Sequence, residues 1–296
     1  MDVSYFKRKV NKIFTIFALW KPLQDVRRLE LLIMKAIFEE SYFLSAGECN
    51  AEREMSLPIL VAKIIDIATA HANSLGIGNP SMEAMHAGWV LSRLTIDMTE
   101  YPKVNDNYVL TTWIESYNRH YSERAFRISS PDGKVYGYAR SIWMVMDTVN
   151  RTNVGLSHLP LDPSIIDGTK APIPTQARHS TIVESCDGEL PRNTILANKP
   201  TFDYRFKYCD LDFYRHVNTI RYVTLLLNRF TLEEHDERFA RRLELSFMHE
   251  ARYGMETQLM RTDSESDGED VSAFLLQNKA DSSPLFFARL FRKKRE

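Results

Sequence analysis

Acidic side chains and an imidazole gather in one short stretch of the sequence, CDLDFYRHVNTIRYV at residues 209–223. Asp210 and Asp212 stand just before His216, and the apolar residues that follow recur at helical spacing over 217–230. The first N–H groups of a helix lack partners within it and carry partial positive charge, so a helix start can stabilise an oxygen that becomes negative. Carboxylates and an imidazole at such a place suit the activation of water against a carbonyl group.

A third acidic side chain is expected at the same place. The strand predicted over 241–251 brings Glu250 about as far beyond this helix as Tyr101 lies beyond an earlier one. In a small sheet that curls around a helix, this strand runs beside the helix start, so Asp212, His216 and Glu250 are expected to converge. Burial and like charge raise the pKa of a carboxyl group, which suits it to take a proton from water. The competing interpretation is that Asp212 caps the helix and His216 is a half-buried helix residue.

The chain repeats one pattern at the scale of half its length. Aligning NAEREMSLPILVAKII with DLDFYRHVNTIRYVTLL places Glu52 opposite Asp212 and Ser56 opposite His216, at an offset of 160. The pairs further along, at an offset of 149, are Arg93-Leu94 with Arg242-Leu243 and Ala139-Arg140 with Ala288-Arg289. Ordered matches at nearly constant offsets indicate a duplicated domain, and only the second copy carries the acid–base set.

Each copy predicts a strand, a long helix and an antiparallel meander. The helices are expected over 57–75, which Gly76 ends, and over 217–230. The strands are expected over 42–55, 89–98, 107–118, 124–130 and 135–147, and again over 202–209, 241–251, 255–264, 271–279 and 285–293. Pro131-Asp132-Gly133 predicts a tight turn. This order predicts an α+β fold in which a sheet wraps each long helix.

The expected division of the chain has four parts. They are an N-terminal extension over 1–40, a domain over 41–154, a proline-rich surface linker over 155–200 and a second domain over 201–296. The apolar run at 13–20 is too short to span a bilayer, so it predicts a helix on the protein body or on a membrane surface. Residues 1–33 are expected to be dispensable for folding.

Composition excludes several classes of protein. Lys plus Arg number 38 against 39 Asp plus Glu, so nothing predicts nucleic-acid binding. The three cysteines lack metal-like spacing and favour a reducing, cytoplasmic location. HEARY at 249–253 lacks the second histidine of a zinc motif, and neither a phosphate loop nor a nucleophile elbow is present. We expect no metal, no cofactor and no integral membrane segment.

Three further features have ordinary interpretations. Cys209 is disfavoured as a nucleophile. His71 lies on an apolar helix face and is expected to be packed and hydrogen-bonded. The basic tail at 292–295 is expected to be a solvated end, or else a docking point for an acidic partner protein.

Taken together, the motifs resemble the acyl-acyl carrier protein (acyl-ACP) thioesterases of the hotdog superfamily. In the second half they are Asp210-Leu211-Asp212, His216-Val217-Asn218 and Arg221-Tyr222-Val223. In the first half they are Trp89-Val90-Leu91-Ser92-Arg93, Thr112-Trp113, Arg124 with Phe126, Asp132-Gly133 and Ala139-Arg140-Ser141-Ile142-Trp143. The resemblance covers residues 41–292.

The resemblance implies two tandem hotdog domains and release of a free fatty acid from the phosphopantetheine arm of acyl carrier protein. Asp212, His216 and Glu250 match catalytic positions, with Glu250 as the water-activating base and the other two positioning and polarising. The C-terminal domain would be catalytic, and the N-terminal domain would form the acyl-chain pocket, without any cofactor.

Two positions depart from the plant enzymes of this family. Tyr214 stands where they have Asn, and Ala251 stands where they have Cys, which favours direct attack by water over a cysteine nucleophile. Tyr214 and Asn218 are expected to position the substrate. The acyl-pocket candidates are Leu60, Ile64, Met82 and Trp89.

Other functions stay open at this point. An acyl-CoA thioesterase fits the same signature, because coenzyme A carries the same phosphopantetheine arm. A non-catalytic acyl-binding or acyl-carrier-binding protein is the alternative from another class, with Tyr214 marking lost activity. A dehydratase on this fold is less favoured. Chain-length preference is not readable from the sequence, and a homodimer remains open.

Overall fold

The computed structural model describes residues 36–157, 159, 163–176, 181–183, 194–196 and 201–295. The predicted N-terminal extension therefore lies almost wholly outside the described residues, as does the prediction about residues 1–33. Within the described parts of the chain, no helix is long and apolar enough to cross a membrane.

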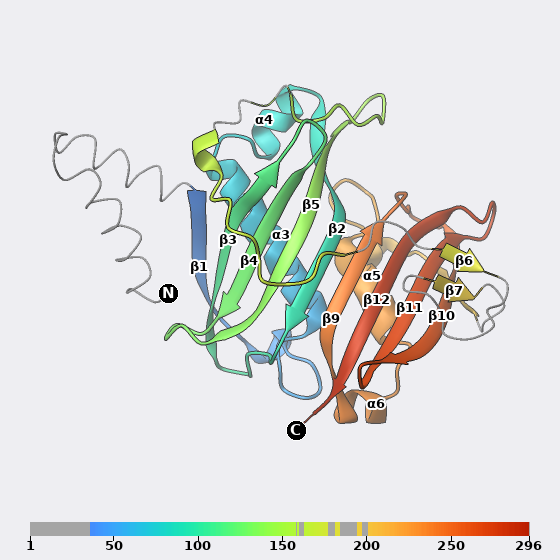
Figure 1. The fold of residues 1–296 in the computed structure, drawn as a ribbon. Helices are drawn as coiled ribbons and strands as arrows, with labels where there is room; N and C mark the ends of the chain where they lie inside the picture. Colours follow the sequence, from blue (N-terminus) through green and yellow to red (C-terminus); the bar gives the residue numbers. More distant parts are fainter. Residues whose placement is uncertain are drawn as a thin grey trace.

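Ten antiparallel strands form one continuous sheet, in the order β1-β3-β4-β5-β2-β9-β12-β11-β10-β8 (Figure 1). Their bounds are β1 Ile37–Phe43, β2 Ala87–Met98, β3 Asn107–Tyr117, β4 Ser122–Ser129, β5 Val135–Asp147, β8 Thr201–Arg205, β9 Arg238–Phe247, β10 Glu256–Ser266, β11 Glu269–Asn278 and β12 Pro284–Lys294. A separate parallel pair consists of β6 Thr181–Val183 and β7 Thr194–Leu196. The α+β prediction is confirmed, and all eight predicted meander strands form.

The first strand of each half ends earlier than predicted, and β1 also begins at Ile37, before the predicted start at Tyr42. β1 ends at Phe43 and β8 at Arg205, and each is followed by a 3₁₀ turn, η1 Ala46–Glu48 and η3 Tyr208–Asp210. The physical reason is local: the carboxylate of Glu48 accepts the N–H of Ser45 at 3.1 Å, and that of Asp210 accepts the N–H of Lys207 at 2.7 Å. These bonds turn the backbone out of the extended conformation.

The long helix of the first half starts at the predicted residue and ends one residue before the predicted end. Helix α3, Leu57–Ser74, buries Leu60, Val61 and Ile64 against the sheet. Gly76 follows at φ +74°, and the N–H of Ile77 bonds to the carbonyl of Ala72, which closes the C-terminus. Helix α4, Asn79–Ala84, comes directly after it and contacts β2.

The second long helix is shorter at both ends than predicted. Helix α5, Thr219–Leu227, starts after Asn218, whose side chain accepts the N–H of Ile220 at 3.1 Å. At its other end the chain tightens into a turn, and Thr231 then caps a separate helix, α6 Leu232–Glu237. The apolar run over 217–230 therefore contains a shorter helix, which the Asn218 cap begins and the turn over 228–230 ends.

Backbone hydrogen bonds correct the register of the repeat. The N–H of Asn50 bonds to the carbonyl of Glu54 as that of Asp212 bonds to His216, at 2.8 Å in both cases. Similar pairs throughout this segment give an offset of 162, so the predicted offset of 160 is wrong by two residues. The true counterparts of Asp212 and His216 are Asn50 and Glu54. The later offset of 149 holds and makes Tyr101 the counterpart of Glu250.

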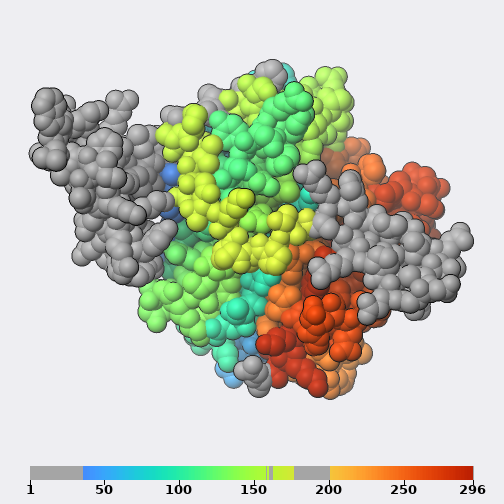
Figure 2. All heavy atoms as spheres, viewed as in Figure 1, coloured from blue at the N-terminus to red at the C-terminus, as the bar shows by residue number. Residues whose placement is uncertain are grey.

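The two halves of the sheet join at β2 and β9. Thr95 pairs with Glu244 across this seam, and these two residues are 149 positions apart, as counterparts in the repeat are. The chain over 163–176 runs across the sheet face opposite α3 (Figure 2). At its end Gln176 accepts a hydrogen bond from Thr95 at 3.1 Å and donates one to the carbonyl of Leu245 at 3.0 Å.

The basic tail is not a free solvated end. Arg292 is buried, lies 3.3 Å from the carboxylate of Glu234 and stacks on the ring of Phe230. Arg295 pairs with Glu54 at 2.8 Å. Both arginines are held within the chain, which leaves Lys293 and Lys294 as the exposed part of this segment.

Candidate active site

A short turn fixes the backbone of His216. One carboxylate oxygen of Asp212 accepts the N–H of Tyr214 at 2.9 Å and that of His216 at 3.0 Å. Arg215 adopts a left-handed backbone, φ +65°, to close the turn. Asp212 therefore caps this turn rather than the helix, and His216 lies before α5 rather than on it. The expected helix-cap role belongs to Asn218 instead.

Glu250 lies on the segment that follows β9. The N–H groups of Met248 and His249 both bond to the carbonyl of Leu285, at 3.0 and 3.2 Å. The carbonyl of Ala251 accepts the N–H of Val217 at 2.9 Å. Glu250 is thereby anchored on both sides, next to the turn that carries His216.

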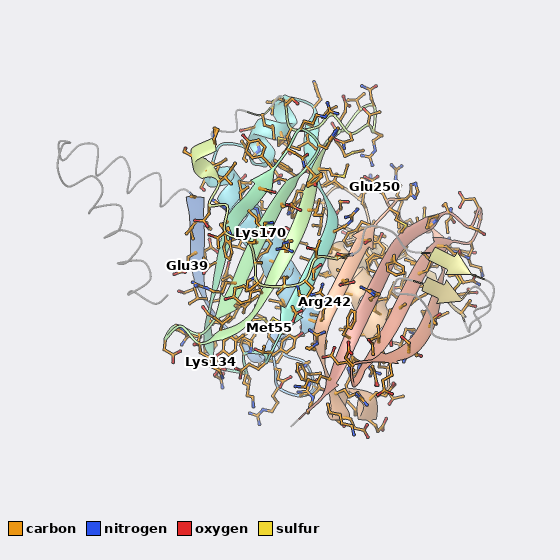
Figure 3. The ribbon with its side chains drawn as sticks, viewed as in Figure 1. Glu39, Met55, Lys134, Lys170, Arg242 and Glu250 are labelled. Atoms are coloured by element: carbon orange, nitrogen blue, oxygen red, sulfur yellow. The ribbon has the colours of Figure 1, made fainter. Side chains whose placement is uncertain are left out.

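Three side chains lie near the carboxylate of Glu250, which Figure 3 labels. His216 Nε2 lies 3.3 Å from Glu250 Oε2, and the guanidinium of Arg151 forms an ion pair with the same oxygen. Arg252 lies further away, at 4.0 Å. The side chains of His216 and Glu250 are 23% and 36% exposed, so both can meet a water molecule and a substrate.

The surroundings of His216 favour its neutral form. Burial lowers the pKa of His216, and the positive charges of Arg151 and Arg252 lower it further. The negative charge of Asp212 acts in the opposite direction but does not outweigh them. At pH 7 the imidazole is therefore uncharged and can exchange a proton with a neighbour.

The contacts found for Tyr214 and Asn218, the two residues expected to position the substrate, are to residues other than Glu250. The Tyr214 ring packs at a tilt of 39° against Phe213, with centroids 4.0 Å apart, and is about half exposed. Burial and then the charge of Glu83 raise the pKa of Tyr214, which keeps its hydroxyl protonated. Asn218 uses its side-chain oxygen to cap α5.

The four acyl-pocket candidates are divided between two apolar clusters. Leu60 and Ile64 on α3 are fully buried in the main core. Met82 and Trp89 belong to a second cluster near α4, where the indole N–H of Trp89 donates to the carbonyl of Ile77 at 2.7 Å. The structure does not bring the four side chains together.

The structure also places His71, Cys209 and Ala251, which the sequence analysis discussed. His71 is fully buried, contacts Arg124 at 2.7 Å and stacks on Phe38, which confirms the expected packing. Cys209 is exposed and Ala251 is fully buried. Among the residues that the structure describes, no three His, Cys, Asp or Glu side chains gather as metal ligands would.

Sequence reasoning missed Arg151. It lies on the turn after β5 in the first half of the chain, far from Glu250 in sequence. No motif or periodicity marks an arginine in such a turn. Its one local signal is the polar turn sequence Asp147 to Asn150, which predicts a loop but not what the loop reaches.

Two family models match consecutive parts of this chain. The acyl-ACP thioesterase N-terminal domain matches residues 35–157, and the acyl-ACP thioesterase C-terminal domain matches residues 196–292. The chain belongs to the acyl-ACP thioesterase family. Membership in this family fits the site geometry, since the matched C-terminal region holds Asp212, His216 and Glu250.

Known proteins of this family resemble the chain along most of its length. A palmitoyl-acyl carrier protein thioesterase of Gossypium hirsutum is 21% identical over 92% of this chain and 63% of the relative. An oleoyl-acyl carrier protein thioesterase of Arabidopsis thaliana is 24% identical over 90% of this chain and 76% of the relative. The chain spans between 46% and 63% of the length of four of the curated relatives it matches.

Solved structures share the fold. An acyl-ACP thioesterase from Bacteroides thetaiotaomicron superposes with a TM-score of 0.75 at 23% identity, covering 88% of this chain and 99% of that one. The 12:0-ACP thioesterase from Umbellularia californica gives a TM-score of 0.71 at 18% identity, covering 88% and 95%.

Proposed function

We propose that this member of the acyl-ACP thioesterase family hydrolyses the thioester of acyl-ACP and releases a free fatty acid. The observation that carries the proposal is the approach of His216 Nε2 to Glu250 Oε2 at 3.3 Å, with Asp212 holding the backbone of His216. Family membership supports the substrate class. The acyl carrier protein is the proposed partner.

In the proposed reaction, Glu250 takes a proton from a water molecule whose oxygen attacks the thioester carbonyl. The tetrahedral intermediate collapses when the carbon–sulfur bond breaks. The sulfur of the phosphopantetheine arm leaves and gains the proton, so the products are a fatty acid and a free carrier thiol. Neutral His216 and the positive end of the α5 dipole would polarise the carbonyl oxygen.

We also propose the division of labour within the chain. Residues 41–154 and 201–296 would be tandem hotdog domains joined by a linker over 155–200, and the repeated hydrogen-bond pattern supports this. The second domain would carry out catalysis. The first would hold the acyl chain, with Leu60, Ile64, Met82 and Trp89 as candidates for its lining, and Tyr214 and Asn218 would contact the substrate near the carbonyl.

The test is thiol release from acyl-ACP and acyl-CoA that carry the same chain, with wild-type protein and Glu250→Gln. We expect preferential release from acyl-ACP and a fall of at least about a hundredfold in Glu250→Gln, because a positioned base contributes that much or more. Glu265→Gln, an exposed glutamate of β10, is the matched control and should retain full activity.

Other results would redirect the proposal. Equal or faster release from acyl-CoA would make coenzyme A the carrier. A folded protein that binds acyl-ACP but releases no thiol would be a non-catalytic binding protein. Full activity in Glu250→Gln would remove Glu250 from the role of base.

A further inference from the structure

Arg151 reaches Glu250 from the other half of the chain. It follows β5, whereas Glu250 follows β9. Its guanidinium pairs with Glu250 Oε2, the oxygen that faces His216 Nε2 at 3.3 Å. One carboxylate oxygen is thus occupied by a cation and an imidazole together.

The turn that carries Arg151 is closed by its own hydrogen bonds. One carboxylate oxygen of Asp147 accepts the N–H of Val149 at 2.8 Å and that of Asn150 at 2.7 Å. The N–H of Arg151 bonds to the carbonyl of Asp147 at 3.0 Å, and Arg151 has a left-handed backbone, φ +58°. This conformation costs an L residue about 1–2 kcal/mol, so it persists only where the surroundings hold it.

The charges around the pair come from several elements. Arg151 approaches from the turn after β5, Arg252 from the segment after β9 and Asp212 from the turn before α5. Glu83 on α4 acts on Tyr214 nearby. Arg252 is the weaker cation for Glu250, because it lies 4.0 Å away with a side chain that is 65% exposed, against 42% for Arg151.

We propose that Arg151 is a positioning residue: its ion pair fixes Oε2 of Glu250 beside His216 and leaves Oε1 to accept the proton of the attacking water. This role rests on the proposed thioester hydrolysis. The cation also opposes protonation of His216, because a nearby positive charge makes it harder to add another. The active site is therefore assembled from both halves of the chain.

The experiment compares Arg151→Gln with Arg151→Lys in acyl-ACP hydrolysis across pH. Arg151→Gln should lower kcat/KM about ten- to a hundredfold through kcat, the loss expected when a reacting group is misplaced. Its acidic limb should move to higher pH, because His216 then binds a proton more readily. Arg151→Lys should restore part of the rate and most of the pH profile.

Two variants serve as controls. Arg119→Gln removes the same charge from the neighbouring β3–β4 turn, where the side chain contacts His120, and should match wild type. Arg252→Gln removes the more distant cation and should give a smaller change than Arg151→Gln. Equal kinetics and equal pH profiles in Arg151→Gln and Arg119→Gln would overturn the proposal. A lower Tm of Arg151→Gln without a shift of the acidic limb of its pH profile would overturn it as well.

A second readout does not depend on activity. The ring protons of His216, followed by NMR through a pH titration, should report a higher pKa in Arg151→Gln than in wild type. An unchanged His216 pKa in Arg151→Gln would contradict the role proposed for Arg151, even if the wild type hydrolyses acyl-ACP. An inactive wild type with a shifted titration would instead remove the proposed function and retain Arg151 as the cation that controls this pair.

Discussion

At the scale of single residues, the roles of Asp212 can be separated by looking at its counterpart. Asn50 occupies the same place in the first half, and its side-chain oxygen accepts the N–H of Glu54 at 2.8 Å. Asp212 does the same for His216 at 3.0 Å. A neutral amide is therefore sufficient to hold this turn. The negative charge of Asp212 is left with an electrostatic task, which is to oppose the lowering of the His216 pKa.

Asp212→Asn should accordingly fold with an unchanged Tm and lose activity. We expect kcat/KM to fall about a hundredfold, the lower end of what positioned acid–base groups contribute. The control is Asp281→Asn, which removes a charge from another aspartate that caps a turn, at Ser283. Thermal unfolding and thiol release, both measured on Asp212→Asn and Asp281→Asn, test this prediction. Loss of folding in Asp212→Asn would mean that the charge itself is structural.

At the scale of elements, the start of α5 connects stability to the site. Asn218 caps the helix through its side-chain oxygen, and the N–H of Asn218 bonds to the carbonyl of Asp210 at 2.8 Å. The next residue towards the N-terminus, Val217, is bonded to the segment of Glu250. A loosened cap would thus loosen the two backbone segments that carry His216 and Glu250.

Asn218→Ala should lower the free energy of unfolding by about 1 kcal/mol, because it removes the capping oxygen. Asn218→Asp keeps that oxygen and adds a favourable charge at a helix N-terminus, so its stability should equal that of wild type. Urea unfolding checks both. If Asn218→Asp is stable but loses kcat/KM, the amide nitrogen contacts the substrate, as the sequence led us to expect.

At the scale of the whole molecule, the candidate active site in the second half has a counterpart in the first half. In the first half that region is filled by other contacts. In the first half the Tyr101 hydroxyl donates to the carbonyl of Ala240 at 2.7 Å and is buried. Glu54, the counterpart of His216, is paired with Arg295 from the end of the chain. These contacts occupy the region that corresponds to the exposed pair of His216 and Glu250 in the second half.

The seam between the halves contains buried charge. Glu244 receives two hydrogen bonds from Arg242, at 2.7 and 2.9 Å, and others from Arg289, all with buried side chains. Glu244→Ala should lower the free energy of unfolding by about 3–5 kcal/mol, because it leaves the buried Arg289 without its carboxylate and leaves Arg242 with Asp97 alone. Glu100→Ala, which breaks an exposed pair with Lys134, should have a much smaller effect. Similar midpoints in denaturant for the two variants would contradict this account.

Much of the fold follows from sequence pattern because periodicity is a local property. The helix over 57–75 and the eight meander strands were predictable from apolar spacing, and Gly76 marked the end of α3. The expected approach of Glu250 to His216 followed from the order of elements alone. The length of α5 did not follow, because the Asn218 cap begins the helix and a turn over 228–230 ends it, and apolar spacing marks neither.

The sequence by itself determined the α+β class, the existence of a repeat and the residue types available for acid–base chemistry. The tertiary structure decided the register of the repeat, since apolar residues of the two helices match at either offset and only the backbone hydrogen bonds tell the two offsets apart. It also decided that Arg151 joins Glu250 and that Arg295 joins Glu54. Such pairs link distant parts of the chain, and their energy depends on distances and burial that arise only when the two halves pack together.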